Sequence, residues 1–506
     1  MANANLFQAF ASPAARTPTK PFLLSDRELV TYGDMLELSG RAAAVLREYG
    51  VGAGDRVVSQ VEKSSSAVFL YLGCLRMGAI FIPLNTAYTR TEIDYFLRDA
   101  EPTLFVCPAT TEKALRQTPG LLLPGAVLTL EADGSGTFTN EMHQHNPETS
   151  IVDRQPDDTA AILYTSGTTG RSKGAMITHA NLHTNVVSLN EIWAWANDDV
   201  LLHSLPIYHA HGLFVGLHCA MLNANTIIWH DRFEADRVID DLPRASVFMG
   251  VPTFYTRLLA SPRFDVEVVS GMRLFISGSA PLLEPVFEAF EVRTGQRILE
   301  RYGMTEALMI TSNPYVGERK AGSVGYPLPG VRVRVADEDG QPLPAKAPGS
   351  LEIKGPNVFK GYWRNPEKTA AEFRRDGWFV TGDIADIADD GRVSLIGRAK
   401  DLVITGGFNV YPKEVELLID LMPGITESAV IGVPHPDFGE AVVAVVAAKD
   451  RSELEAPTMI SSLRGQLAAF KVPKRIFVVD ELPRNAMGKV QKSLLREQYK
   501  STFAEG

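Results

Sequence analysis

A dense run of glycine and hydroxyl residues is the clearest chemical feature of the sequence. Residues 165–170 read Thr-Ser-Gly-Thr-Thr-Gly and follow the apolar segment 160–163, with Lys173 three positions later. Glycine lets backbone N–H groups approach an anion, hydroxyl groups add donors, and lysine adds positive charge. A polyphosphate is therefore the expected ligand of Thr165, Ser166, Gly167, Thr168, Thr169, Gly170 and Lys173. The spacing is not that of a Walker loop, whose second glycine would fall on Ser172; a plain flexible loop is the alternative.

Four histidines form a second candidate cluster, because His203, His209, His211 and His218 fall within sixteen residues. His209 and His211 alternate, so on a strand they would share one face. A metal site is one interpretation. We favour a role without a metal, since the nearest downstream carboxylate, Asp231, is distant in sequence.

Five motifs resemble the adenylate-forming superfamily, which includes acyl-CoA synthetases, luciferases and the adenylation domains of peptide synthetases. The loop at 164–174 is similar to its signature loop. The other motifs follow in the superfamily's order: Arg-Tyr-Gly-Met-Thr-Glu at 301–306, Thr-Gly-Asp at 381–383, Gly-Arg-Ala-Lys-Asp at 397–401 and Pro-Arg-Asn-Ala-Met-Gly-Lys at 483–489. The resemblance covers essentially the whole chain. Segments 83–88, 249–259 and 355–363 are most similar to malonyl-CoA synthetases.

The resemblance implies an enzyme that makes an acyl-AMP from a carboxylate and ATP and then transfers the acyl group to coenzyme A. Lys489 matches the catalytic lysine, and a lysine suits this role because one flexible charge can follow charge that moves between two oxygens. Glu306 matches the Mg²⁺ carboxylate, and Thr305 beside it would contact the α-phosphate. His209 would line the acyl pocket. Without the flanking motifs, Glu306 and Lys489 would be read as ordinary surface residues.

The same resemblance implies the remaining nucleotide and coenzyme contacts. Asp383 would accept both ribose hydroxyls, which a carboxylate can do at once, and Arg398 would be its partner. Ser279 and Ala280 would lie beside the adenine, and Tyr302 would belong to the same site. Gly407 would let the backbone approach the pantetheine of coenzyme A, although an ordinary turn is nearly as good an interpretation.

Malonate as the acid would bring a second carboxylate into the pocket, and a buried carboxylate needs a cation. Arginine can bind it with two parallel N–H···O bonds, and Arg257 and Arg301 are the candidates, with Ser279 as a further donor; surface ion pairs are the alternative. Ala210 and Met309 indicate a small, apolar wall with room for a substituent on the central carbon. Methylmalonate or a larger alkylmalonate is therefore a second candidate. Another small carboxylic acid, a carrier-protein loading enzyme and a non-catalytic nucleotide sensor are the competing hypotheses.

Composition fits a large globular enzyme. The 506 residues, 45% of them hydrophobic, suggest two to four folding units and argue against disorder. A net charge of −10 makes nucleic acid and anionic membranes poor partners. We expect no secretory signal and no apolar run of the ~18–20 residues that a membrane span needs. Three scattered cysteines favour a reducing cytoplasm over a disulfide framework or zinc site.

Helical and strand-like patterns alternate along residues 31–110 and again after 158, which predicts an α/β fold with a largely parallel sheet. We predict a helix near 64–75, strands near 79–84, 103–107, 247–252 and 274–278, and a long surface connection at 131–158. Strict alternation at 331–335 and 350–354 predicts antiparallel strands. The sequence thus predicts a large domain, 1–399, of α/β layers plus a β-rich subdomain, which would hold the ATP and acyl pocket. A small, mobile α+β domain, 400–506, would follow a hinge at Lys400 and carry Lys489.

Overall fold

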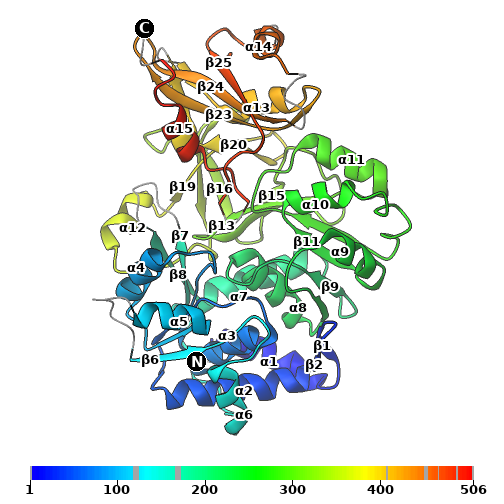
Figure 1. Ribbon diagram of the computed structural model, residues 1–506, viewed down its shortest axis with the longest axis vertical. Coiled ribbons are helices and arrows are strands. Elements are labelled where there is room, and N and C mark those ends of the chain that lie inside the picture. The colour runs from blue at the N-terminus through cyan, green and yellow to red at the C-terminus, as the bar shows by residue number, and fades with distance from the viewer. Residues whose placement is uncertain are drawn as a thin grey trace.

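The protein is described by a computed structural model that covers residues 3–117, 125–165, 172–405, 408–448, 454–464, 466–485 and 488–503. Figure 1 shows two α/β layers at the bottom, a β-rich subdomain beside them and a small domain at the top. The C-terminal end lies in the small domain, far from the N-terminal end (Figure 1).

The first layer is a mostly parallel sheet. Over the described residues it has seven strands in the order β18-β8-β7-β4-β3-β5-β6, and β3 to β7 run parallel. The strands are β3 (Arg56–Ser59), β4 (Ile80–Pro83), β5 (Leu104–Cys107), β6 (Ala126–Thr129), β7 (Thr159–Thr165), β8 (Lys173–Thr178) and β18 (Gly361–Tyr362).

The second layer is also built on parallel strands. Within the described ranges its nine strands run in the order β15-β14-β13-β12-β11-β9-β10-β1-β2. They are β1 (Pro21–Leu24), β2 (Leu29–Thr31), β9 (Val200–His203), β10 (Thr226–Trp229), β11 (Val247–Gly250), β12 (Leu274–Ser277), β13 (Leu299–Met304), β14 (Leu308–Ser312) and β15 (Tyr326–Pro327).

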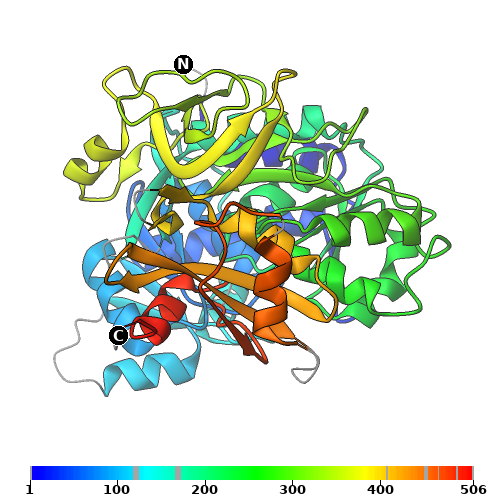
Figure 2. The same ribbon diagram turned by 90° about the horizontal axis from the view of Figure 1, so that it is seen from above.

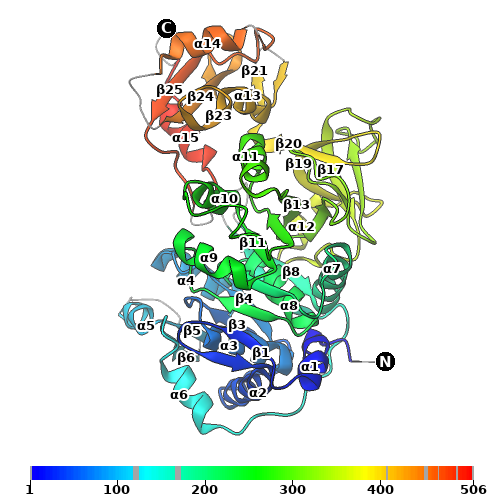
Figure 3. The same ribbon diagram turned by 90° about the vertical axis from the view of Figure 1, so that its right-hand side faces the viewer.

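Helices separate and cover these two sheets (Figure 3). They are α1 (Leu6–Arg16), α2 (Tyr32–Glu48), α3 (Ser65–Met77), α4 (Arg90–Ala100), α5 (Ala109–Arg116), α6 (Thr137–Gln144), α7 (His179–Ile192), the π-helix η1 (His211–Leu217), α8 (His218–Leu222), α9 (Ala235–Asp241), the 3₁₀ turn η2 (Leu242–Arg244), α10 (Pro252–Leu259) and α11 (Glu284–Thr294).

Helix α3 shows how the sequence sets this arrangement. The Ser64 side chain accepts a hydrogen bond from the Ala67 N–H, and Gly78 ends the helix in the left-handed conformation with φ +68°, as N-cap and C-cap residues commonly do. Every residue of α3 is buried. Its Tyr71 contacts Phe214 and His218 of the next layer. The helix predicted near 64–75 is confirmed, and it is a core helix between the layers.

The β-rich subdomain is antiparallel, as the alternating residues predicted. Among the described residues, four strands run in the order β16-β17-β19-β20. They are β16 (Arg332–Ala336), β17 (Gly349–Lys354), β19 (Phe379–Ile387) and β20 (Val393–Arg398), and α12 (Pro366–Glu372) precedes β19. The predicted surface connection at 131–158 was partly wrong, because α6 lies inside it and buries Phe138 and Met142.

The small domain follows the 3₁₀ turn η3 (Ala399–Asp401), which contains the predicted hinge residue Lys400. Its described elements are β21 (Val403–Thr405), β22 (Phe408–Val410), α13 (Pro412–Asp420), β23 (Ile425–His435), β24 (Gly439–Ala448), α14 (Ala456–Arg464), β25 (Arg475–Val479) and α15 (Lys492–Tyr499). Seen from above, it lies over the large domain (Figure 2). The predicted fold class is confirmed, while rotation about Lys400 stays a prediction. No helix in the described ranges is long and apolar enough to span a bilayer.

Candidate functional site

Segments from several elements bring the motif residues together where the small domain meets the large one. Arg301 and Tyr302 lie on β13, and Ser279 follows β12. Parallel strands such as β11, β12 and β13 place their carboxyl ends at one edge of the sheet, which is where ligands bind in α/β folds. Lys489 reaches this edge from the small domain.

Asp383 is the centre of the first part of the site. The Tyr302 hydroxyl donates to its Oδ2, and Arg398 Nε lies 2.9 Å from its Oδ1. The pairing of β19 with β20 sets Arg398 directly opposite Asp383. Burial raises the pKa of Asp383, against the opposing charge of Arg398. Three separate sequence motifs thus form one hydrogen-bonded group.

Glu306 is the centre of the second part. It is buried between β13 and β14, and its Oε1 accepts hydrogen bonds from Thr165 Oγ1 at 3.2 Å and from the Tyr362 hydroxyl at 3.1 Å. Burial raises the pKa of this carboxyl group. Lys173 Nζ lies 3.8 Å from Glu372 Oε1 and 5.2 Å from the centre of the Tyr362 ring. A carboxylate, hydroxyl groups and an ammonium group therefore border the entry to the glycine-rich loop.

Arg301 is the centre of the third part, and its side chain is only 3% exposed. Its Nε and Nη2 have no hydrogen-bond partner among the described residues, although such buried donors are normally satisfied. Burial lowers the pKa of the guanidinium to about 10. A Cβ atom on Gly278 would lie 2.4 Å from Arg301 Cζ, so this glycine makes room for the group.

Two histidines border Arg301. His211 Nδ1 lies 3.2 Å from Ser279 Oγ, and its buried Nε2 has no partner within the described chain. His209 Nδ1 accepts a hydrogen bond from the His211 N–H at 3.3 Å, so a neutral His209 carries its proton on Nε2. Burial, together with Lys489 and Arg301, lowers the pKa of His209 to about 3. Both rings are therefore neutral donors or acceptors near neutral pH.

Lys489 joins these groups from the small domain. Its backbone N–H donates to Asn485 Oδ1 at 3.0 Å. The residue is exposed, yet protein atoms crowd its ammonium group, and this desolvation, followed by the charge of Arg398, lowers its pKa. Asp383 and Glu306 act in the opposite direction. One ammonium group thus interacts with all three parts of the site.

The other predicted residues are placed as follows. Thr305 and Ala280 are half-buried next to Glu306 and Ser279, while Ala210 and Met309 are buried. Arg257 is exposed in the last turn of α10, two positions and therefore about 200° beyond Tyr255, which faces the core. Its contact with an acid stays a prediction. Outside the described residues lie Ser166, Gly167, Thr168, Thr169, Gly170 and Gly407.

The four histidines do not gather round a metal. His203 and His218 bond Gly212 O and the Tyr71 hydroxyl, away from Ser279, and the described residues contain no group of three or more His, Cys, Asp or Glu that could hold a metal ion. The shared face that a strand would give His209 and His211 does not arise, because His211 begins a π-helix.

Sequence reasoning missed Tyr362 as part of the site, and it placed Gly278 only in the turn 277–281 that would lie beside the adenine, without its contact with Arg301. Tyr362 lies in the segment 355–363, which stood out only by resemblance, and its contact with Glu306 joins residues 56 positions apart. Glycine is needed at position 278 because the Arg301 side chain lies directly beside it. No local pattern indicates either contact.

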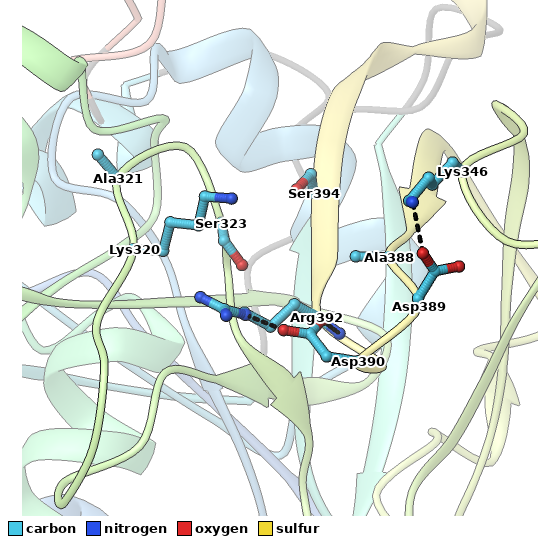
Figure 4. A pocket seen from close by; sticks show the side chains of 9 residues that line it. All are labelled: Lys320, Ala321, Ser323, Lys346, Ala388, Asp389, Asp390, Arg392 and Ser394. Carbon is cyan, nitrogen blue, oxygen red and sulfur yellow. Dashed lines mark hydrogen bonds and ion pairs between the residues drawn. The ribbon is translucent and has the colours of Figure 1, made fainter.

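A hollow of about 320 Å³ lies elsewhere, at the turn between β19 and β20. Four of its charged groups are paired: Figure 4 shows Lys346 paired with Asp389 and Arg392 with Asp390. None of the residues that line it belongs to the three parts above. We therefore assign the chemistry to the edge near Arg301.

Comparison with known proteins agrees with this geometry. The sequence model of the family described as AMP-binding enzyme matches residues 10–363, and that of the AMP-binding enzyme C-terminal domain matches residues 414–489. A feruloyl-CoA synthase from Amycolatopsis sp is 35% identical, over 93% of this chain and 94% of its own. The mitochondrial malonate–CoA ligase of Mus musculus is 36% identical, over 94% of this chain and 86% of its own.

A solved structure is similar over the full length. The crystal structure of ATP-bound MatB from Rhodopseudomonas palustris is 50% identical and superposes with a TM-score of 0.96. The match covers 99% of this chain and 100% of that one. The arrangement of the small domain over the large one is therefore similar to that of an ATP-bound relative.

The space that Gly278 leaves for the Arg301 side chain gives a first prediction. Gly278→Ala would place a Cβ atom 2.4 Å from Arg301 Cζ, so the buried guanidinium would have to move. We expect a loss of about 1–3 kcal/mol in the free energy of unfolding, which is typical of an overpacked core, as measured by urea denaturation.

Gly271→Ala is the matched control, because its Cβ would meet nothing closer than Pro243 O at 3.6 Å. Its change should stay within about 0.5 kcal/mol. Equal losses in the two variants would show that Gly278 does not give Arg301 its room.

Proposed function

The chain belongs to the AMP-binding enzyme family, and on that premise we propose that it is an ATP-dependent malonate:CoA ligase. Malonate and ATP would give malonyl-AMP and pyrophosphate. The thiol of coenzyme A would then displace AMP to give malonyl-CoA. The malonate–CoA ligase among its relatives supports this assignment. The observation on which it depends most is the buried, unpartnered Arg301.

Arg301 supports a dicarboxylic acid by its chemistry. The N–H bonds of Nε and Nη2 point in parallel from one edge of a guanidinium, and both of these buried atoms lack a hydrogen-bond partner among the described residues. A carboxylate accepts such a pair with both oxygens. A buried cation without an anion is unfavourable, so the distal carboxylate of malonate would complete the site. A monocarboxylic acid would leave Arg301 unpaired.

The reacting carboxylate would lie between Arg301 and Lys489. It attacks the α-phosphorus of ATP, and negative charge then builds on the phosphoryl oxygens and the leaving pyrophosphate. Lys489 would offset this charge at both the attacking oxygen and the α-phosphate. Thr305 would donate to the α-phosphate. His209, neutral and carrying its proton on Nε2, would orient the acid.

The parts of the site centred on Asp383 and Glu306 would bind the nucleotide. Asp383 would accept the ribose hydroxyls, with Arg398 and Tyr302 holding its carboxylate in place. The backbone at Ser279 and Ala280 would border the adenine. Thr165, Lys173 and the glycine-rich loop between them would bind the polyphosphate.

Glu306 has the chemistry to hold Mg²⁺. Carboxylate oxygen is a hard ligand of the kind that Mg²⁺ prefers, usually together with substrate phosphates, and Glu306 lies beside Thr165 at the entry to the phosphate loop. When bound, the ion would supply positive charge to the polyphosphate. Glu306 and Thr165 would position it.

The second half-reaction would need the small domain to turn about Lys400, so that the backbone at Gly407 borders the pantetheine of coenzyme A. Domain rotation of this kind lets one acid pocket serve two steps. Free coenzyme A, rather than a carrier protein, is the acceptor that the CoA ligases among the relatives support. Three free, buried cysteines suit a reducing cytoplasm.

Substituted malonates belong to the same proposal. Ala210 and Met309 are both buried, and their side chains would form an apolar wall beside the central carbon of the acid. Methylmalonate keeps both carboxylates and adds one methyl group, so it would satisfy Arg301 equally well.

Arg301→Met tests the assignment of the acid. The change keeps length and removes the charge and donors, and a charge-assisted bond of this kind contributes about 1.5–3 kcal/mol. We expect kcat/KM for malonate to fall about 10- to 200-fold in an assay of AMP release. The residual activity with propionate, which has no distal carboxylate, should change far less. A proportional loss for both acids would mean that Arg301 does not read the second carboxylate.

Lys489→Ala tests the two-step mechanism. It should abolish malonate-dependent pyrophosphate exchange, because the lysine acts on charge that develops only during adenylation. Formation of malonyl-CoA from supplied malonyl-AMP should largely survive. The two half-reactions are measured separately, and equal losses in both would contradict the assigned role.

A further inference from the structure

Lys63 is a buried lysine that bonds residues of the second layer, and burial lowers its pKa well below the usual range. It is 6% exposed and lies in the segment between β3 and α3, directly before the N-cap Ser64. Its Nζ donates to His203 O at 2.9 Å, lies 2.7 Å from His203 Nδ1, and lies 4.0 Å from the centre of the Trp229 ring. Lys63 therefore joins the layer of β3 to β9 and β10 of the other layer.

These contacts determine which ring nitrogen of His203 carries the proton. The Gly212 carbonyl can only accept, and His203 Nε2 lies 3.0 Å from its oxygen, so the neutral ring carries its proton on Nε2 and donates to Gly212 O. His203 Nδ1 is then the acceptor for Lys63 Nζ. The His203 ring also stacks on Trp229, with 5.1 Å between ring centres. A hydrogen bond from Lys63 Nζ thus stabilises the tautomer that bonds Gly212.

Gly212 belongs to the first turn of the π-helix η1. A Cβ atom on Gly212 would lie 2.1 Å from Pro206 O, so the backbone fits here only with glycine. One on Gly216 would lie 3.0 Å from His203 Cδ2, a tight contact with the ring. Single π-turns are frequent at functional sites. Here His203 stabilises the turn by its hydrogen bond to Gly212 O.

The same turn presents two side chains to the acid site. His211, its first residue, bonds Ser279. His209 bonds the backbone N–H of His211, and its carbonyl accepts from the Leu213 N–H at 3.0 Å. A shift of Gly212 would therefore move both rings that border Arg301.

We propose that Lys63 and His203 are positioning residues for acid binding, which act through the Gly212 carbonyl on His209 and His211. The proposal rests on the proposed function for the identity of the acid. Neither residue contacts the motif residues at the nucleotide, Asp383 and Arg398, so their effect should fall on the acid rather than on ATP. A misplacement of about 1 Å in such a site can cost about 100-fold in rate.

Lys63→Met removes the donors and keeps an unbranched chain over Trp229. With the purified full-length protein, kcat/KM for malonate at saturating ATP should fall about 10- to 100-fold. The KM for ATP should change less than about twofold. Thermal unfolding of the same samples reports stability.

Arg76→Met is the matched control for loss of a buried basic side chain. Arg76 is also 6% exposed, donates to the backbone at Leu36 O, and lies 4.6 Å from the Phe7 ring centre, in contacts with α1 and α2. The Arg76→Met variant should have a lower Tm than the wild type, while its kcat/KM for malonate should stay within about twofold of the wild-type value. A similar kinetic loss in Arg76→Met would overturn the proposal.

The double variant Lys63→Met/His203→Phe separates positioning from stability. Replacing both buried polar partners by apolar groups of similar shape can be nearly neutral for folding, so Tm should recover toward that of the wild type. The malonate defect should persist, because Phe cannot donate to Gly212. Recovery of both Tm and kcat/KM would overturn the proposal, and so would unchanged kinetics in Lys63→Met. A wild-type protein without malonate-dependent AMP release would instead refute the proposed function.

Discussion

The arrangement of the acid site depends on one buried positive charge, that of Arg301. Two nitrogens of its guanidinium have no hydrogen-bond partner in the part of the chain that the structure describes. Arg301 cannot lose its proton near neutral pH even though burial lowers its pKa to about 10. Its neighbours adapt to that charge. Gly278 clears space for it, and the pKa of His211 is held well below its usual range by burial and by Arg301. A second positive ring beside Arg301 is thereby avoided. Glu300 interacts with Arg301 electrostatically, but Nε and Nη2 bond no described residue, which leaves these two donors for a ligand.

The small domain adds a second cation to the same place. Lys489 interacts with Arg301, Arg398, Asp383 and Glu306, although the protein as a whole has a net charge of −10. Positive charge is therefore concentrated where two anions, a dicarboxylate and ATP, would meet. Their binding would relieve repulsion among the cations and so stabilise the small domain over the large one.

Much of the fold could be predicted because its signals are local. Ser64 and Gly78 bound α3, and alternation at 331–335 gives the antiparallel strand β16. The helix α6 was missed because only two of its residues, Phe138 and Met142, are buried. In the site, Glu306, Asp383 and Lys489 were found through motifs. The network of Lys63, His203 and Gly212 was not, since contacts across two layers leave no local pattern and a lone buried lysine looks like any other lysine in a sequence.

The most direct test of whether Arg301 binds a carboxylate is to compare the affinities of two acyl-adenylate analogues. Both resist hydrolysis; one carries a malonyl group and the other a propionyl group. The two analogues share the nucleotide and differ by the distal charge, so titration calorimetry isolates the contact with the guanidinium. We predict that the malonyl analogue binds at least about tenfold more tightly, as a charge-assisted hydrogen bond requires. Equal affinities would contradict a site organised round an unpaired arginine.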